Sequence, residues 1–193
     1  MKIISSLLIL LLTLVSCGNG VNEVAHTGVC DGYLQWDNSD YVLPFPAGKS
    51  YKVTQSNCAP VSHFGSQQYA YDFEMKTSDS IVASRAGNVI EVVEGNEDGN
   101  GCPDDNHVYI QHTDGSVAHY LHLTKNGAVV NVGDSVSQGD PIGLAGNTGC
   151  STDTHLHFVV FKSKSYEESL PITFSNTDSN ARGLKTDSTY TAK

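Results

Sequence analysis

The chain has 193 residues and carries 21 acidic against 11 basic side chains, a formal net charge of −10 at neutral pH. This length predicts one domain with enough residues to bury a hydrophobic core. The acidic balance disfavours nucleic acid as a partner, and it also disfavours attachment to an anionic membrane surface by charge.

The first segment has the composition of an export signal. One positive charge at Lys2 precedes an apolar run over residues 3–15, which is too short to span a bilayer as a permanent helix. The run ends in Leu14-Val15-Ser16-Cys17, which resembles the lipobox of bacterial lipoproteins. We therefore expect a signal peptide over 1–16 and acyl chains on Cys17, with a plain secretory signal as the alternative.

Acylation of Cys17 would place the chain in the cell envelope, as an exported lipoprotein attached to a membrane by its lipid. Gly18 follows this cysteine, in the position where an aspartate is associated with inner-membrane retention. We therefore expect the periplasmic face of the outer membrane rather than the inner membrane, and a monomer.

Export also changes how the other cysteines are interpreted. Four remain once Cys17 is set aside, and an even number in an oxidising compartment favours two disulfides. No Cys-x-x-Cys pair is present to support a zinc site made of thiolates. The pairing is left open among the four candidates, which are Cys30, Cys58, Cys102 and Cys150.

The two ends of the mature chain are polar and lack a clear hydrophobic period. Residues 17–42 are expected to be the lipidated cysteine and a spacer, and residues 175–193 a polar C-terminal tail that is frayed or disordered. The folded domain is expected between them, over residues 43–174.

Between these ends the hydrophobic period is two, and no stretch indicates an amphipathic helix. Turn residues separate the strand candidates, and residues 96–105 are expected to form a long hairpin loop. The sequence therefore predicts an all-β fold, a single compact antiparallel domain with few or no helices. The expected strands are Tyr51–Gln55, Tyr69–Phe73, Ile81–Ala83, Asn88–Val93, His107–Gln111, Ser116–Leu123 and His155–Phe161.

The last of these strands carries two histidines at alternate positions. Side chains two residues apart project from one face of a strand, with Cα atoms about 6.5 to 7 Å apart. The rest of the segment is apolar on both faces, which indicates a central strand. His155 and His157 therefore suit a metal site, and two ordinary half-buried histidines on an edge strand are the alternative.

A carboxylate in an apolar strand offers a further ligand. Asp72 shares one face of Tyr69–Phe73 with Ala70, and a buried carboxylate needs a cation to face it. The loop residue His63 is close enough in sequence to fold back over this strand. With one histidine of the downstream pair, His63 and Asp72 make a set that suits Zn²⁺ with a fourth position for water. A salt bridge from Asp72 to a lysine or arginine is the alternative.

Two more histidines lie in the segment Ala118-His119-Tyr120-Leu121-His122. In a regular strand, alternation puts His119 and His122 on opposite faces, so only one of them can face a given site. The spacing does not say which.

Three sequence blocks together carry a family resemblance. The first is His63 with the segment Tyr69-Ala70-Tyr71-Asp72-Phe73, the second is Tyr120-Leu121-His122-Leu123, and the third is a glycine-rich stretch before His155-Leu156-His157-Phe158. Together they resemble the lysostaphin-type zinc metalloendopeptidases, which cleave bacterial cell-wall peptides. The resemblance covers about Pro44 to Lys162 and implies a barrel-sandwich-like sheet domain of the lysostaphin-peptidase type.

The resemblance also implies roles for single residues. It implies one Zn²⁺ per chain, with three ligands, namely His63, Asp72 and His157. It implies catalytic roles for His122 and His155, with His119 a bystander on the opposite face.

One departure concerns the first block. The common family pattern has three residues between the first histidine and the aspartate, whereas eight separate His63 from Asp72. A longer loop before an intact strand resembles a subgroup of the family, so the assignment is kept. The other candidates for the first ligand are His26, His107 and His112.

The implied reaction is hydrolysis of a peptidoglycan peptide bond by a water that zinc activates. The sequence has no His-Glu-x-x-His glutamate to serve as the base. His122 and His155 would therefore move the proton and stabilise the developing oxyanion, in either division of the two roles.

Two other functions fit parts of the same pattern. A catalytically inactive regulator of other wall hydrolases would have the same fold, but the complete ligand set favours the enzyme. The glycine-rich half also resembles biotinyl or lipoyl carrier domains, with Met75-Lys76 as the modified dipeptide. Export of the chain disfavours a carrier.

Overall fold

The computed structural model describes residues 30–193, so the expected signal peptide, Cys17 and His26 lie outside the described residues. None of the residues from 30 onward is in an α-helix, and none is in a helix long and apolar enough to cross a membrane. In chain order the elements are η1 (Trp36–Asn38), β1 (Ser50–Gln55), η2 (Gly65–Gln67), β2 (Tyr71–Glu74), β3 (Ser80–Val82), β4 (Gly87–Val93), β5 (His107–Gln111), β6 (Val117–Leu121), β7 (Leu123–Ala128), β8 (Ser135–Val136), β9 (Pro141–Ala145), β10 (His155–Phe161) and β11 (Thr189–Thr191).

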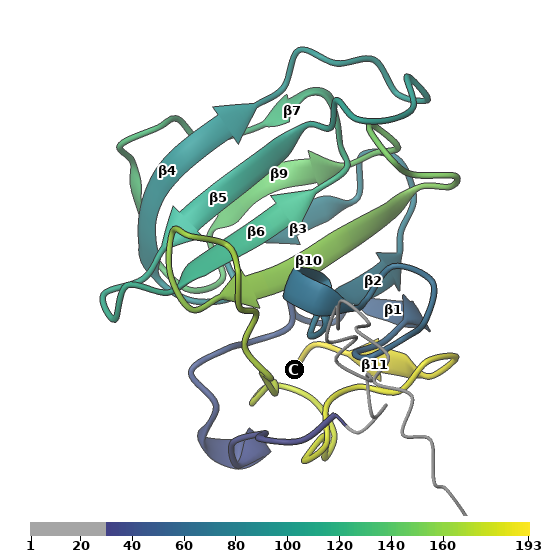
Figure 1. Cartoon of the computed structure of the whole chain (residues 1–193). Coiled ribbons are helices and arrows are strands. Elements are labelled where there is room, and N and C mark those ends of the chain that lie inside the picture. The colour runs from purple at the N-terminus through teal and green to yellow at the C-terminus, as the bar shows by residue number, and fades with distance from the viewer. Residues whose placement is uncertain (1–29) are drawn as a thin grey trace, which may run out of the picture.

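The strands form two sheets, and within each sheet neighbouring strands pair antiparallel (Figure 1). The larger sheet has the order β11-β1-β2-β10-β6-β5-β4-β8, and the smaller has the order β3-β9-β7. β10 is central, since it pairs with β2 on one side and with β6 on the other. This arrangement confirms the prediction of an all-β antiparallel domain.

The main hydrophobic core joins the two sheets. Apolar side chains from one face of the larger sheet are buried in one cluster with side chains from the smaller sheet. Those from the larger sheet include Ile110, Tyr120 and Phe158, and those from the smaller sheet include Ile81, Leu123 and Ile142. The face of the larger sheet that points away from this core can therefore carry a functional site.

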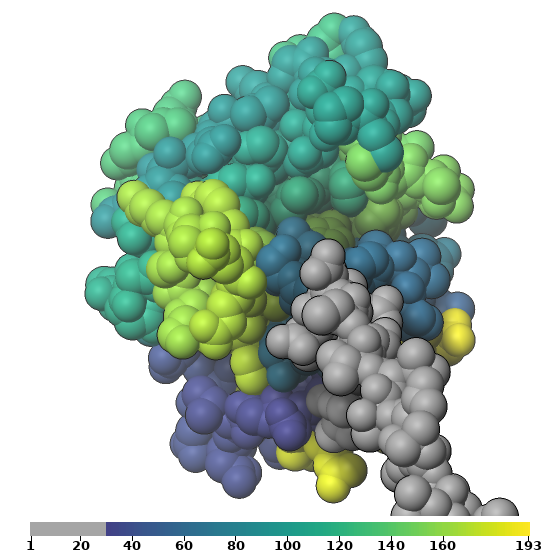
Figure 2. All heavy atoms as spheres, in the orientation of Figure 1, coloured from purple at the N-terminus to yellow at the C-terminus, as the bar shows by residue number. Residues whose placement is uncertain are grey.

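β10 is apolar on both faces, as expected, because each face has its own cover. Phe158 and Val160 belong to the main core, whereas Val159 and Phe161 form a second small cluster that Tyr166 packs against. Figure 2 shows the segment that follows β10, in yellow-green, standing beside the blue loop that precedes β2. His155 and His157 lie on the face with the second cluster, opposite the main core.

Several strands differ from the sequence prediction, since β8, β9, β11 and most of β7 were not expected. The segment expected as one strand over Ser116–Leu123 is interrupted at His122, which has a φ of 66° and separates β6 from β7. β9 lies in the glycine-rich stretch before His155, where no strand was expected, and a Cβ on Gly143 would meet Leu123 Cδ2 at 2.6 Å. The glycine there permits close packing between strands rather than a turn. The long β4–β5 loop is confirmed, since these strands pair as a hairpin across residues 94–106.

The expectation of a frayed C-terminal tail was wrong. β11 pairs with β1, with Ser50 opposite Thr191, and Leu184 and Ala192 are buried in the main core. The segment is polar in composition, but strand pairing and two well-placed apolar side chains are enough to fix it.

The described part of the expected spacer, residues 30–42, is also attached to the domain. Tyr41 is buried in the main core, and Cys30 is disulfide-bonded to Cys58 in the loop before β2. The second disulfide joins Cys102 to Cys150. These two bonds confirm the prediction of two disulfides among the four candidate cysteines.

Candidate metal centre and its histidine pair

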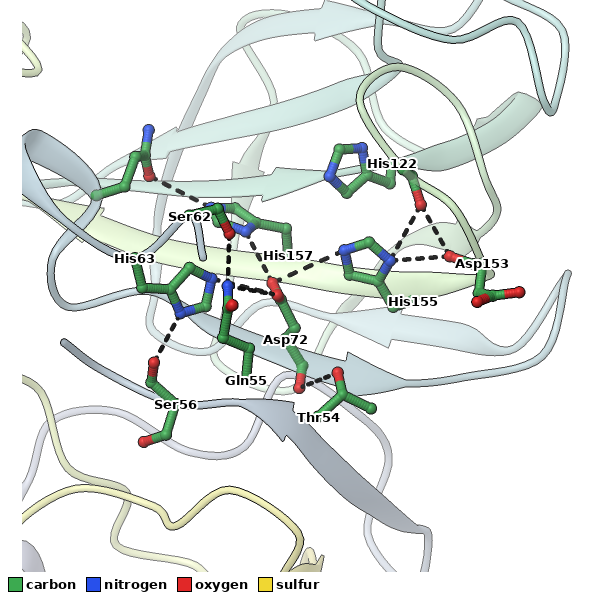
Figure 3. Close-up of polar contacts among 12 residues, drawn as sticks. Thr54, Gln55, Ser56, Ser62, His63, Asp72, His122, Asp153, His155 and His157 are labelled. Atoms are coloured by element: carbon green, nitrogen blue, oxygen red, sulfur yellow. Dashed lines mark hydrogen bonds and ion pairs between the residues drawn. The ribbon is translucent and has the colours of Figure 1, made fainter. Parts of the chain in front are cut away.

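Two of the three predicted ligands are brought together by strand register. β2 and β10 pair so that Asp72 lies directly opposite His157. Directly opposite residues project from the same face of a sheet. His157 Nδ1 accordingly lies 2.8 Å from Asp72 Oδ1 (Figure 3).

The third predicted ligand comes from the loop between β1 and β2. His63 is fully buried, and its Nδ1 lies 2.8 Å from the carbonyl oxygen of Ser56. A carbonyl only accepts hydrogen bonds, so Nδ1 carries the proton of a neutral ring and Nε2 keeps the lone pair. This Nε2 lies 3.2 Å from Asp72 Oδ2 but has no hydrogen-bond partner.

Both ring nitrogens of His157 face acceptors. Its Nδ1 lies 2.8 Å from Asp72 Oδ1 and donates a hydrogen bond to that carboxylate, and its Nε2 lies 3.3 Å from Gln67 Oε1. The unpartnered Nε2 of His63, the Nδ1 of His157 and the Asp72 carboxylate therefore converge on one space. A cation placed between them would replace the Nδ1 proton of His157 and contact all three groups.

The donor set fits zinc. His63, Asp72 and His157 each offer one ligand atom, and these atoms all lie within 4.8 Å of one another. Two imidazole nitrogens and one carboxylate oxygen are a zinc ligand set that leaves a position open for catalysis. In each of these histidines, the ring nitrogen that is not the candidate ligand atom faces a protein acceptor. His63 Nδ1 faces the carbonyl oxygen of Ser56, and His157 Nε2 faces Gln67 Oε1. Such contacts orient metal-bound imidazoles.

Asp72 is ionised in this setting. Burial by itself raises the pKa of Asp72, but its contacts with His157 and His63 outweigh burial and hold the pKa well below its usual range. Gln55 Nε2 donates a further hydrogen bond to Asp72 Oδ2 at 3.3 Å. The carboxylate therefore keeps its charge for a cation at any ordinary pH.

The two predicted catalytic histidines lie beside this centre. His155 Nε2 is 3.7 Å from Asp72 Oδ1, and the ring centroid of His122 is 4.7 Å from that of His155 and 5.9 Å from that of His157. Burial, followed by repulsion from His155 and His157, lowers the pKa of His122 to about 4. His122 is therefore neutral at pH 7. The fold thus brings all five predicted site residues into one cluster.

The prediction that His119 lies on the opposite face was wrong. His119 pairs with Val159, which shares its face of β10 with His157, so His119 is on the face that carries the metal centre. The reason is the left-handed φ of His122, which breaks the alternation that the prediction assumed. His119 is nevertheless stacked on Tyr109, with ring centroids 3.5 Å apart, and contacts none of the three ligand side chains.

The two described alternatives for the first ligand have other partners. His107 lies between Asp105 and Glu91, at 3.1 Å and 3.3 Å. His112 Nδ1 donates to the carbonyl oxygen of Ala86 at 2.8 Å. Neither belongs to the group that could hold a metal ion, whereas His63 does belong to it despite its long spacing.

Comparison with known proteins assigns the family. Residues 66–169 match peptidase family M23. The chain belongs to this family. The matched segment contains both catalytic candidates and two of the three ligands, and it begins just after His63, whose long spacing from Asp72 departs from the common pattern.

Individual M23 relatives cover parts of the chain. An uncharacterized metalloprotease of Buchnera aphidicola is 32% identical over 126 residues, which are 63% of this chain and 31% of that protein. Peptidoglycan DD-endopeptidase ShyA of Vibrio cholerae is 49% identical over 53 residues, which are 28% of this chain and 12% of that protein. This chain thus spans less than a third of the length of either curated relative.

A solved structure supports the fold. The antimicrobial peptidase lysostaphin from Staphylococcus simulans has a TM-score of 0.50 and 31% sequence identity to this chain, covering 62% of this chain and 46% of that one. The predicted lysostaphin-peptidase type of sheet domain is confirmed.

Several residues that support the M23 site were not predicted. Gln55 and Gln67 contact the ligands, and Thr148 accepts a hydrogen bond from His122 through its carbonyl oxygen. No motif marks them, because the contacts depend on the β1–β2 register, on the η2 turn and on a loop backbone. The only available signal was the position of Gln55 at the end of an expected strand.

A groove opens beside the M23 centre. It has a volume of about 620 Å³ and reaches from Asp72 and His155 toward the exposed side chain of Glu74. Its other lining residues are Thr54, Gln55, Met75, Thr152, Asp153 and Thr154. The groove is thus lined by one candidate ligand, Asp72, and by one of the two predicted catalytic histidines, His155.

Proposed function

We propose that this chain is a zinc-dependent endopeptidase that hydrolyses peptide bonds of bacterial peptidoglycan, with one Zn²⁺ per chain held by His63, Asp72 and His157. The observation that carries the proposal is the convergence of the unpartnered Nε2 of buried His63 with the Nδ1 of His157 and the Asp72 carboxylate. Membership of peptidase family M23 supports the reaction class, and similarity to the peptidoglycan DD-endopeptidase ShyA supports peptidoglycan as the substrate.

The metal and the histidine pair have separate tasks. Held by His63, Asp72 and His157, zinc would supply a Lewis acid for the peptide carbonyl and for the attacking water. His122 and His155 present their Nε2 atoms toward the same space, because the Nδ1 of each is engaged by a backbone carbonyl. One imidazole would accept the proton of the attacking water on its Nε2, and the other would donate a hydrogen bond to the developing oxyanion when it is an imidazolium with a proton on both nitrogens.

The groove supports a peptide as the substrate. It is open at the surface and runs alongside β2, from Asp72 toward Glu74. The threonine side chains of Thr54, Thr152 and Thr154 line it and offer hydrogen-bond partners to a peptide backbone.

We propose that the enzyme acts at the periplasmic face of the outer membrane, attached by acyl chains on Cys17. The lipobox-like sequence supports this location. The net charge of −10 offers no attraction to an anionic polymer, so tethering near the wall would supply the local concentration that charge does not.

Zinc content tests the proposal directly. The full chain, purified in detergent, is expected to contain about one zinc ion per chain, and the His63→Ala and Asp72→Ala variants are expected to contain little. Asp178→Ala is the matched control, because Asp178 is an exposed carboxylate that pairs with Lys193 far from the centre. The same preparations are then incubated with purified peptidoglycan, and the release of soluble peptides is measured by mass spectrometry.

The two possible failures differ. A folded parent that binds no zinc, even when zinc is added, would exclude the metallopeptidase. A parent that binds zinc and peptidoglycan but releases no peptides would be the regulator of other wall hydrolases instead.

A further inference from the structure

One loop holds both members of the histidine pair. The loop joins β9 to β10 and comprises residues 146–154. His122 Nδ1 lies 2.7 Å from the carbonyl oxygen of Thr148. His155 Nδ1 lies 2.9 Å from the carbonyl oxygen of Asp153 and 3.1 Å from Ser151 Oγ (Figure 3).

These contacts fix the tautomer of both rings. A carbonyl oxygen can only accept, so each Nδ1 must donate and each neutral ring keeps its lone pair on Nε2. A neutral imidazole with its proton on Nε2 has no lone pair on that atom, so it cannot serve as a base at the metal centre. The backbone of a single loop therefore sets the chemical form of two catalytic side chains, His122 and His155.

The side chain of Thr148 fastens this loop next to His122. Thr148 is fully buried. Its Oγ1 donates to the carbonyl oxygen of Leu123 at 2.8 Å and accepts from the backbone N–H of Asn106 at 2.8 Å. Leu123 directly follows His122, so the hydroxyl ties the loop to the strand break that gives His122 its direction.

The Cys102–Cys150 disulfide fastens the same loop from outside. Cys150 stands between Thr148 and Ser151, and its partner lies in the β4–β5 loop. Two hydrogen bonds run beside the disulfide. Asn147 N–H donates to Asp98 Oδ1 at 2.6 Å, and Gly149 N–H donates to Asn100 Oδ1 at 2.7 Å.

The zinc ligands do not depend on this loop. His63 is held by Ser56, and His157 by Gln67, which lie on the other side of the centre. Asp72 receives its extra hydrogen bond from Gln55 on β1.

We propose that Thr148 and the Cys102–Cys150 disulfide are positioning elements of the catalytic pair, which hold residues 146–154 so that His122 and His155 both keep Nε2 free for the substrate. The catalytic meaning of this inference rests on the proposed function. The tautomers themselves do not, and they can be measured without any substrate.

The first experiment records the tautomers. The full chain is labelled with ¹⁵N at histidine, and long-range ¹H–¹⁵N correlations are collected at pH 8, where ordinary imidazoles are neutral. We expect the Nδ1–H form for His122 and His155 in the parent. We expect a mixture of both forms for His122 in Thr148→Val and for both rings in the Cys102→Ser/Cys150→Ser variant. An Nε2–H form in the parent, or unchanged spectra in both variants, would overturn the inference.

The second experiment separates positioning from metal binding. Thr148→Val is expected to lower kcat by roughly 10- to 100-fold with little change in KM and with its zinc retained. Thr148→Ser keeps the hydroxyl and should restore most of the rate. Thr173→Val is the matched control, because Thr173 is another buried threonine whose hydroxyl bonds a carbonyl away from the site, and its rate should equal the parent rate.

The outcomes keep the two proposals apart. If the parent digests peptidoglycan and Thr148→Val is equally fast, positioning is refuted and the proposed function stands. Loss of zinc from Thr148→Val would also refute positioning, since the loop would then act on the ligands. A parent that is inactive on peptidoglycan refutes the proposed function, while the spectra still decide the role of the loop.

Discussion

The three candidate metal ligands and the pair His122 and His155 lie side by side, yet the chain places them by different means. Asp72 and His157 face each other because two paired strands have a fixed register. His122 and His155 owe their orientation to carbonyl oxygens of a loop. The metal half of the site thus owes Asp72 and His157 to sheet register and His63 to a loop, whereas loop backbone orients both members of the histidine half.

Each half also has its own disulfide. Cys30–Cys58 fastens the loop that carries His63, and Cys102–Cys150 fastens the loop that holds the histidine pair. Small exported domains commonly rely on disulfides where the core does not reach. The two bonds therefore offer a way to loosen one half of the site at a time.

The largest effect is expected from Asp72→Asn, which removes the only charge of the ligand set. The amide keeps the shape of the side chain but leaves two imidazole lone pairs without an anionic partner for the cation. We expect zinc to fall below one tenth of the parent content, roughly, and peptide release to fall to background. Zinc analysis and the peptidoglycan assay check this, and a zinc-loaded, active Asp72→Asn variant would contradict the ligand assignment.

The next effect separates the two halves of the site. His122→Ala and His155→Ala are each expected to lower kcat by roughly two to four orders of magnitude while about one zinc per chain is retained. His112→Asn is the control, since His112 is buried but donates to Ala86 away from the centre. If either alanine variant lost its zinc, the division into a metal half and a histidine half would be wrong.

Strand alternation explains how much of the site the sequence could predict. Period-two patterns located β2 and β10, and with them the faces of Asp72 and His157. The family resemblance added the roles of His122 and His155. His63 required the resemblance as well, because no rule of spacing brings a loop residue nine positions away onto a strand.

The remainder could not be predicted because it depends on tertiary contacts. The left-handed φ of His122 reversed the predicted face of His119, and no residue type in that segment announces such a break. The polar segment before Lys193 was expected to fray, yet strand pairing with β1 fixes it, which local composition cannot reveal. Disulfide pairing was open for the same reason, since four cysteines allow three connectivities.

A smaller effect is expected from loosening the metal half. The Cys30→Ser/Cys58→Ser variant removes a cross-link across 28 residues and should lower the free energy of unfolding by roughly 2 to 4 kcal/mol. His63 is in the loop that Cys58 fastens, so zinc should bind more weakly, while kcat at saturating zinc stays near the parent value. Denaturant unfolding and zinc titration check this. A fall in kcat with unchanged zinc affinity would show that the two disulfides do not serve separate halves.

The smallest effect concerns His119, which shares the sheet face of the site but belongs to neither half. Burial lowers the pKa of His119 to about 3, against about 6.5 in the unfolded chain. Because the unfolded state binds the proton more readily, the stability given by neutral His119 is complete above pH 6.5 and is lost as the pH falls toward 3, by at most about 1.4 kcal/mol per pH unit. His107 has the opposite sign, since its contacts with Asp105 and Glu91 outweigh burial and raise its pKa.

Replacing His119 with phenylalanine isolates its contribution. His119→Phe keeps a ring against Tyr109 and Phe161 but cannot be protonated, so its stability should fall less steeply than that of the parent between pH 6.5 and 4. Urea unfolding at a series of pH values measures the two slopes. Equal slopes would mean that His119 is solvated or paired in the folded protein. A shallower slope, together with unchanged zinc content and kcat at pH 7.5, would place His119 outside both the metal centre and the catalytic pair, as a buried support for the sheet face on which they stand.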